Sequence, residues 1–301
     1  MPHLTIAMGL SETNLIPVLV SIKSLLATTR NPHDLAIALF HDGIASPMAS
    51  MVKHVLSSCG TAFTLIDMPR ILSGFAYKDI ICDEMLYPLL IPQYFTSRTF
   101  VLSLGAGALV RDDITTLLEQ FPTEKKLGAV RCLYHAHKQH DAFYGLTREA
   151  EQDIGLTQPE RYFSRNLLLF NRNAISTMEG QTCIQLLDKG WRARDEAILN
   201  HLFQQELHLF PQSWNIPMEL FTEPEDSFIP SARQAVTEGR KDVKICQFSS
   251  SLHPNRIDIG LNQTNNHAQD YKAIARTIMH AMADYAPQAL CGPMWDTMSA
   301  I

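Results

Sequence analysis

The amino-acid sequence predicts an α/β fold in which a mostly parallel, Rossmann-like sheet is covered by helices. Short apolar runs, which are typical of buried strands, alternate with longer segments whose apolar residues recur every three or four positions, as in amphipathic helices. Turns rich in polar residues, glycine or proline separate the two kinds of segment. Strands and helices that alternate in this way form a parallel sheet with crossover helices.

The amino-terminal part of the chain shows the alternation most clearly. Its apolar runs predict strands over 4–10, 35–44 and 62–67, and its periodic segments predict helices from about 11 to 30 and from 47 to 59. The first helix is expected to stop before Pro32, because a residue that precedes proline avoids the helical conformation.

The remainder continues the pattern and divides into two parts. Further strands are predicted over 100–110, 126–134, 166–172, 207–217 and 243–248, with helices near 112–121, 174–189, 195–205 and 270–285, and a loop or weak helix over 224–242. We expect one domain over 1–260 and a C-terminal helical appendage over 261–301. The apolar face of that last helix favours docking onto the domain or a second subunit over membrane binding.

Composition excludes several classes of function. Of the 301 residues, 46% are hydrophobic and 19% charged, as in ordinary folded proteins, and the net charge of −6 disfavours a nucleic-acid partner. The six cysteines show no paired spacing, so we expect reduced thiols in a cytoplasmic protein. No signal peptide and no integral membrane segment is expected, since no apolar run approaches ~20 residues.

Eight collinear segments carry a family resemblance over about residues 4–256. They include YPLLIP (87–92), VLSLGAGALVRDDI (101–114), LGAVR (127–131), YFSRNLLLFN (162–171), DEAILN (195–200) and QFSSSLHP (247–254). In these segments the chain resembles the family 8 glycosyltransferases, a retaining group. The resemblance implies the GT-A fold, a nucleotide-sugar donor that is uridine-linked, a glycan acceptor and a role in polysaccharide biosynthesis.

The metal ligands that the resemblance implies are absent from this sequence. The family holds a divalent ion with two acids spaced i, i+2 and a distant histidine, and here those positions are Gly105, Gly107 and Gln247. None of the three offers the carboxylate or imidazole that such an ion prefers. We therefore expect a degenerate DxD motif and no metal cofactor.

Two acids are the candidate catalytic residues. Asp195 matches the first aspartate of the family's D-Q-D motif, and Glu196 stands in place of the glutamine, which in the family lies beside the anomeric carbon. A carboxylate there can serve as a covalent nucleophile in retaining transfer. The competing interpretation is that Glu196 is a solvated acid at the start of a helix, where acids are favoured.

Candidate nucleotide-sugar-binding residues follow from the ends of the strands and from the family motifs. Arg165 and His253 are candidate phosphate ligands because cationic groups there stand beside the lost ion, although surface exposure is the default for arginine. The glycines of Gly105-Ala106-Gly107 can cradle phosphate through their N–H groups or form a packing turn. The full set is Gly9, Asp42, Gly105, Gly107, Arg165, Asn166, Gln247 and His253.

Two other groups of polar residues favour a structural interpretation. Asp113 matches a family aspartate at a helix start, which favours capping over metal binding. The histidine-rich segment that contains His135, His137 and His140 is expected to be an exposed loop, because it lacks the spacing of a closed metal site.

Two functions remain open. The first is a metal-independent hexosyltransferase. The second is a catalytically inactive glycosyltransferase-fold protein that binds a glycan, a nucleotide sugar or a partner transferase. Either could form a homo-oligomer or associate with a partner glycosyltransferase.

Overall fold

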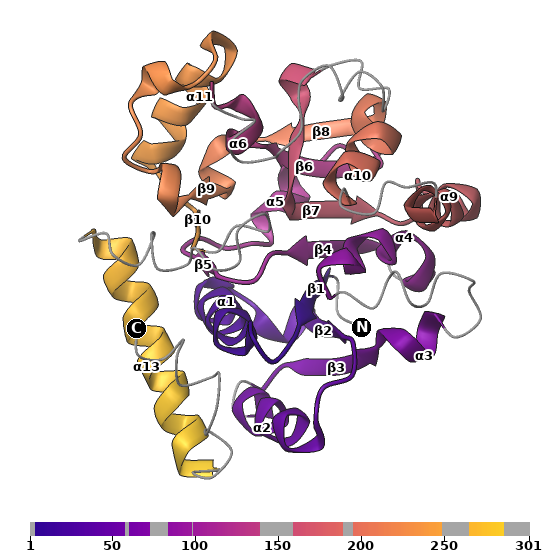
Figure 1. Cartoon of the computed structure of the whole chain (residues 1–301), viewed down its shortest axis with the longest axis vertical. Coiled ribbons are helices and arrows are strands. Elements are labelled where there is room, and N and C mark those ends of the chain that lie inside the picture. The colour runs from indigo at the N-terminus through magenta and orange to yellow at the C-terminus, as the bar shows by residue number, and fades with distance from the viewer. Residues whose placement is uncertain are drawn as a thin grey trace.

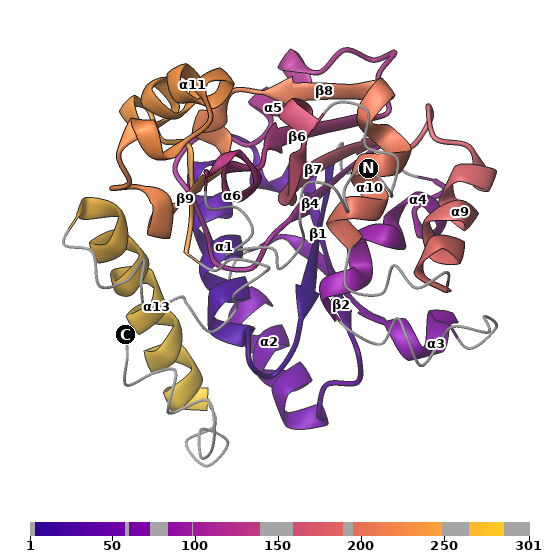
Figure 2. The same ribbon diagram turned by 45° about the horizontal axis from the view of Figure 1, so that its top comes forward.

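A computed structural model describes residues 4–57, 60–72, 84–97, 99–138, 159–188, 195–248 and 265–285. Within these ranges a central twisted sheet lies between helices on both faces (Figure 1). The same arrangement is seen after a 45° turn, with α13 lying along the outside of α1 (Figure 2). The predicted α/β class is confirmed.

The strands are β1 (Leu4–Leu10), β2 (Leu35–His41), β3 (Ala62–Asp67), β4 (Phe100–Leu104), β5 (Ala108–Val110), β6 (Leu127–Arg131), β7 (Phe163–Asn171), β8 (Leu207–Phe210), β9 (Ile216–Pro217) and β10 (Ile245–Gln247). The α-helices are α1 (Leu15–Thr28), α2 (Ser46–Ser57), α3 (Met68–Leu72), α4 (Ile91–Tyr94), α5 (Thr116–Gln120), α6 (Leu133–Ala136), α9 (Thr177–Asp188), α10 (Asp195–Phe203), α11 (Pro230–Lys241) and α13 (Asn266–Tyr285). Short 3₁₀ helices are η1 (Pro32–Asp34), η2 (Glu84–Leu89), η3 (Pro159–Arg161), η4 (Gln204–Glu206), η5 (Gln212–Trp214), η6 (Met218–Leu220) and η7 (Glu225–Ser227).

In the described part of the chain, the main sheet has seven strands in the order β3-β2-β1-β4-β7-β6-β8. All neighbouring pairs are parallel except those of β7, which runs antiparallel to both β4 and β6. The order reverses at β1, and in sheets of this kind ligands bind beyond the carboxyl ends of the strands at such a point. A second sheet has the order β5-β10-β9.

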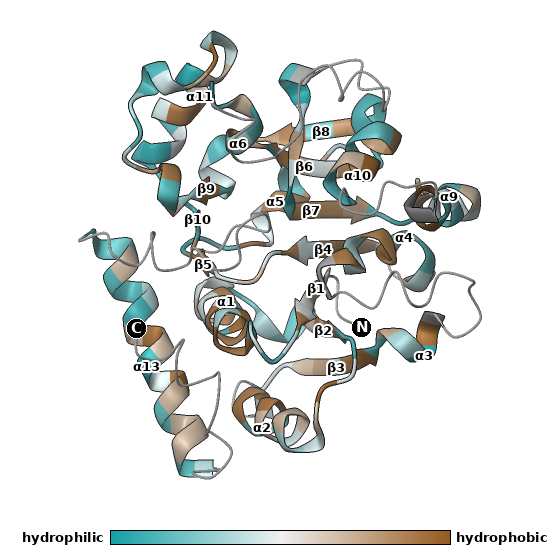
Figure 3. Cartoon of the chain, viewed as in Figure 1, coloured by the Kyte–Doolittle hydropathy of each residue, from teal (hydrophilic) through white to brown (hydrophobic). Residues whose placement is uncertain are grey.

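Side chains alternate between the two faces of the main sheet, as the period of a strand requires. Leu35, Ile37 and Leu39 of β2 join a core with α1, α2 and α13, whereas Ala38 and Phe40 join a core with η2, α4, α9 and α10. Figure 3 shows β4 and β7 as largely hydrophobic, consistent with strands buried on both faces. The helix layers therefore fix the sheet from both sides.

The predicted strand over 100–110 is interrupted in the structure. β4 ends at Leu104, and β5 begins at Ala108 and pairs with β10 in the second sheet. Gly107 between them has φ +82°, a conformation that favours glycine. The segment left open as a loop or weak helix contains the 12-residue helix α11, with Pro230 in its first turn.

The helix α13 shares the hydrophobic core of the main sheet. Tyr271, Ile278 and Met282 are fully buried there, and Ile274 packs at its margin. Arg111, which follows β5, forms an ion pair with Asp270. The apolar face predicted for this helix is thus the one that packs on the domain. No helix in the described ranges has both the length and the apolarity needed to cross a membrane.

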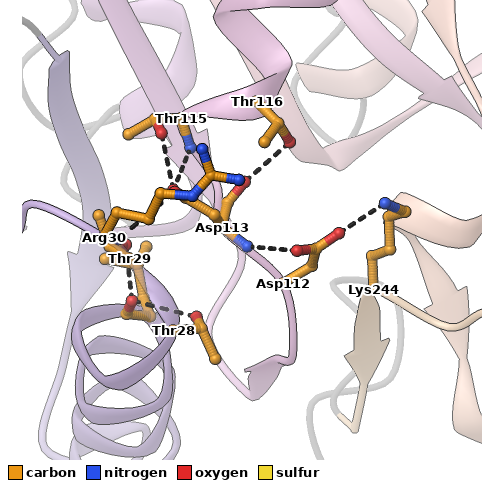
Figure 4. A network of polar contacts seen from close by, with 9 residues as sticks. Thr28, Thr29, Arg30, Asp112, Asp113, Thr115, Thr116 and Lys244 are labelled. Atoms are coloured by element: carbon orange, nitrogen blue, oxygen red, sulfur yellow. Dashed lines mark hydrogen bonds and ion pairs between the residues drawn. The ribbon is translucent and has the colours of Figure 1, made fainter.

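A polar network joins the end of α1, the segment before α5 and the residue before β10 (Figure 4). The Asp113 carboxylate accepts hydrogen bonds from Thr115 N at 3.0 Å and Thr115 Oγ1 at 2.7 Å, and lies 3.4 Å from Arg30 Nε. Lys244 pairs with the neighbouring Asp112, which lowers the pKa of that carboxyl through their hydrogen bond. Both acids are occupied by structural contacts, but Asp113 does not cap α5: the N-cap residue is Thr115, and no side chain makes a capping hydrogen bond there. The Asp113 carboxylate instead stabilises the turn that leads into the helix.

Replacing Asp113 by alanine is expected to lower the free energy of unfolding by about 1–2 kcal/mol, because a buried carboxylate and its two hydrogen bonds to Thr115 are lost. The matched control Asp112→Ala should cost less than about 1 kcal/mol, because that ion pair is partly exposed. Urea denaturation of both variants measures the difference. Equal losses would contradict the role given to Asp113.

Candidate functional site

The carboxyl ends of β1, β2 and β4 lie along one edge of the sheet. Leu10, the last residue of β1, pairs with His41, the last residue of β2, while Leu104 at the end of β4 pairs with Leu167 of β7. Because β7 is antiparallel, its first residues reach the same edge, and Gly105 N donates to Asn166 O at 2.8 Å. The edge therefore brings together segments that are far apart in sequence.

Three buried charged side chains occupy the part of this edge beside β7. Arg165, Asp195 and Glu196 are 9%, 6% and 5% exposed. The Arg165 guanidinium forms an ion pair with Asp195, and the Arg165 backbone N–H donates to Glu196 Oε2 at 2.9 Å. The two acids begin α10 as predicted, but they are buried, so the interpretation of Glu196 as a solvated acid is wrong.

Neutral hydrogen bonds hold the acids in place. Asn200, one turn further along α10, accepts from Phe163 N and donates to Phe163 O, both at 2.9 Å. This clamp fixes the start of α10 against the start of β7. Sequence reasoning passed over Asn200, although a lone amide in the apolar run of α10 is a signal that its hydrogen bonds are satisfied inside the protein.

A buried tyrosine joins the strand ends below the acids. The Tyr87 hydroxyl lies 2.8 Å from Ser103 Oγ, 3.1 Å from Leu104 O and 3.2 Å from Ala7 O. Burial raises the pKa of Tyr87, so its hydroxyl keeps the proton that it donates. Sequence reasoning gave no role to Tyr87 or Ser103, although Ser103 stands out as the polar residue of an apolar strand.

The loop Gly105–Gly107 is closed by contacts within the protein. Gly107 N donates to Pro17 O at 3.3 Å, and Gly107 O accepts from Phe248 N at 3.0 Å. Gln247 is 1% exposed, and its Nε2 donates to Ala106 O at 2.6 Å. Because both glycine amides are engaged, by Asn166 O and Pro17 O, the structure favours a packing turn over a phosphate cradle.

These residues do not fit a divalent ion. Neither glycine has a side chain, and the Gln247 amide donates a hydrogen bond into the loop instead of presenting an imidazole. A Cβ added at Gly105 would lie 3.1 Å from Asn166 Oδ1, so the Asn166 side chain fills the adjacent space. In the described ranges, no group of three or more His, Cys, Asp and Glu side chains could hold a metal.

The other predicted site residues lie at the same edge or outside the described part. Gly9 pairs with Phe40 one residue before β1 ends, and its carbonyl accepts from Asn14 Nδ2 at 3.3 Å. Asp42 is exposed directly after β2. His253 lies outside the described residues. Binding of a nucleotide sugar by these residues stays a prediction.

Part of the histidine-rich segment contradicts the expectation of an exposed loop. His135 and His137 are 2% and 5% exposed, in and directly after α6. His135 stacks on Tyr162, and His137 Nε2 lies 3.9 Å from Glu223 Oε2. Aromatic packing explains their burial. His140 lies outside the described residues.

The stability of the protein is expected to fall below neutral pH. Burial lowers the pKa of His137, more than Glu223 raises it, and burial also lowers the pKa of His208 and His267. A histidine whose pKa is lower in the folded than in the unfolded state does not reduce stability at pH values above the unfolded pKa of about 6.5. As pH falls from that value toward the folded pKa, the unfolded chain binds the proton more readily than the folded one, so protonation favours unfolding. The urea midpoint should therefore decrease as pH is lowered from 7.5 to 5.5. His137→Gln should reduce the slope of the midpoint against pH. The exposed His33→Gln serves as control, and an unchanged slope in His137→Gln would contradict the assignment.

The fold is that of the GT-A glycosyltransferases, as comparison with solved structures shows. The apo structure of the WbbM bifunctional glycosyltransferase matches with a TM-score of 0.67 and 14% identity. The match covers 89% of this chain but only 51% of the WbbM chain. The galactosyltransferase LgtC, solved with donor and acceptor sugar analogs, matches with a TM-score of 0.65 and 18% identity over 91% of this chain and 95% of LgtC. The glycosyltransferase GlyE of Streptococcus pneumoniae matches with a TM-score of 0.61 and 15% identity over 95% of this chain and 64% of GlyE.

The chain belongs to glycosyl transferase family 8, because the model of that family matches residues 5–237. The family resemblance is thereby confirmed, although the segment 247–254 lies beyond the matched residues. No curated protein sequence matches the chain.

Proposed function

We propose that this protein transfers a hexose, with retention, from a uridine-linked nucleotide sugar to a glycan acceptor in polysaccharide biosynthesis, without a divalent ion at the DxD position. Family membership supports the class of reaction. The observation that carries the proposal is the buried pair Asp195 and Glu196, at the edge of the sheet where β1, β2 and β4 end. LgtC, with the same fold, has been solved with donor and acceptor sugar analogs.

The acid pair suits the charge that develops in this reaction. As the bond from the anomeric carbon to the diphosphate oxygen breaks, positive charge grows on the sugar, and a fixed carboxylate stabilises it. In retaining transfer a carboxylate can instead attack that carbon and be displaced by the acceptor oxygen, while the acceptor hydroxyl's proton leaves to the diphosphate. Glu196 and Asp195 are the residues that we assign to these roles.

The donor's diphosphate needs a positive partner. Arg165 is occupied by Asp195, which leaves His253, outside the described residues, as the other predicted ligand. No step here depends on a metal, because Gly105, Gly107 and Gln247 do not supply its ligands.

The test is turnover measured across a panel of nucleotide sugars, each with Mn²⁺ and with chelator, with transfer and donor hydrolysis both recorded. Turnover that the chelator leaves unchanged supports the proposal. Turnover that requires Mn²⁺ contradicts its metal-independent part, and absence of any transfer or hydrolysis contradicts the assignment as an enzyme.

A second function is favoured by the closed Gly105–Gly107 loop and by side chains at Gly105, Gly107 and Gln247 that do not suit a metal ion. An inactive glycosyltransferase-fold protein would bind a nucleotide sugar, a glycan or a partner transferase without chemistry. In that case a ligand from the panel would raise the melting temperature by mass action while no product forms.

A further inference from the structure

The guanidinium of Arg165 has a partner that the sequence does not reveal. Arginine at the ligand-binding edge of this fold is a natural candidate for binding the donor's diphosphate, since its planar fork matches phosphate oxygens. In the structure, however, Nη1 of Arg165 forms an ion pair with Asp195 Oδ2, and both side chains are 9% exposed. The guanidinium is turned inward, toward α10.

The charges around Arg165 do not favour an anion. One arginine faces two acids, Asp195 through its side chain and Glu196 through its backbone N–H. Among the described residues, Tyr87 is a further titratable neighbour of Arg165, and burial raises the pKa of its hydroxyl, which keeps it neutral. Two acids facing one guanidinium are a better partner for a centre that becomes positive than for a diphosphate.

Because Arg165 and the two acids are buried, the charge of each affects the stability of the others. Burial lowers the pKa of Arg165, but the attraction of Asp195 and Glu196 outweighs this and raises it, so the guanidinium stays charged. Two carboxylates that share a buried site repel each other, and the ionised state of both is favoured by a cation between them. The Asn200 clamp holds the backbone of α10 against β7 independently of that cation.

We propose that Arg165 is a positioning residue, an internal counter-ion that holds Asp195 through its guanidinium and Glu196 through its backbone N–H at the sheet edge, and that it does not bind the donor's diphosphate. The proposal rests on the proposed function, because orienting the acids matters for catalysis only if the protein transfers a sugar. Arg165 acts through the acids and needs no contact with substrate.

The experiment compares the full-length wild-type chain with Arg165→Lys, which keeps the charge, and Arg165→Met, which removes it. Three quantities are measured on each folded protein: the affinity for UDP by calorimetry, the titration of the Asp195 and Glu196 carboxyls by ¹³C NMR, and the pH profile of kcat and KM. If Arg165→Met does not fold, Arg165→Lys and the double variant Arg165→Met/Asp195→Leu carry the UDP measurement.

We expect UDP affinity to change by less than about twofold in Arg165→Lys and in Arg165→Met, while the carboxyls titrate at higher pH in Arg165→Met and return toward wild type in Arg165→Lys. In turnover, kcat should fall with an unchanged KM for the donor, and the acid limb of the pH profile should move to higher pH. A tenfold or larger loss of UDP affinity, or carboxyl titration that Arg165→Met leaves unchanged, overturns the proposal.

The two proposals fail differently. If the wild-type chain neither binds UDP nor turns over a nucleotide sugar, the proposed function is wrong, and the carboxyl titration alone decides whether Arg165 is the counter-ion of the acid pair. If the wild-type chain is active but Arg165→Lys loses UDP binding tenfold, the proposed function stands and the counter-ion assignment is wrong.

Discussion

Replacement of Asp195 by alanine is expected to lower the free energy of unfolding by about 3–5 kcal/mol, because it leaves the Arg165 guanidinium buried without its ion-pair partner. The loss should be visible as a large decrease in the urea midpoint. Asp34 is exposed, so Asp34→Ala is the control for removal of an acid. It should change the free energy of unfolding by less than about 0.5 kcal/mol.

The double variant Arg165→Met/Asp195→Leu separates the penalty of an unpaired charge from the value of the pair. Apolar residues of similar volume can replace a buried ion pair at little cost, so the double variant should be more stable than Asp195→Ala alone. A double variant that is as unstable as the single one would show that the loss comes from packing and not from the orphaned charge.

Replacement of Glu196 by glutamine is expected to lower kcat by about 10²–10³-fold, the size of effect seen when one preorganised electrostatic contact to the transition state is removed. The amide keeps an oxygen that can accept from Arg165 N–H, so the fold and the affinity for UDP should be retained. Transfer from the best donor of the panel, measured at saturation, gives the comparison.

The exposed Glu119→Gln is the matched control for this measurement, and it should behave as wild type. A Glu196→Gln variant with unchanged kcat would remove Glu196 from the catalytic residues, whatever the outcome for Arg165. A variant that loses UDP affinity along with kcat would indicate that the site itself had changed.

Much of the fold could be predicted from sequence because burial leaves a periodic signal. The apolar run at 4–10 is β1, and the face that carries Tyr271, Ile278 and Met282 is the buried face of α13. The direction of β7 could not be predicted, since a strand buried on both faces has the same apolar pattern in either direction.

The candidate site was only partly predictable. Strand ends and the family motifs located Asp195, Glu196 and the glycine loop, because each follows a recognisable strand or begins a helix. The pairing of Arg165 with Asp195 joins positions 30 residues apart, and no local pattern encodes it. The hydroxyl network of Tyr87 was missed for the same reason, since its partners lie on β1 and β4.

The contact between Gly105 and Asn166 limits which side chains position 105 accepts. An aspartate introduced at position 105 would place its Cβ 3.1 Å from the Asn166 amide oxygen, so that oxygen must shift slightly before the carboxylate fits. An attempt to install an acid at this strand end is therefore better made as a paired substitution, in which Asn166 is replaced by a smaller residue at the same time.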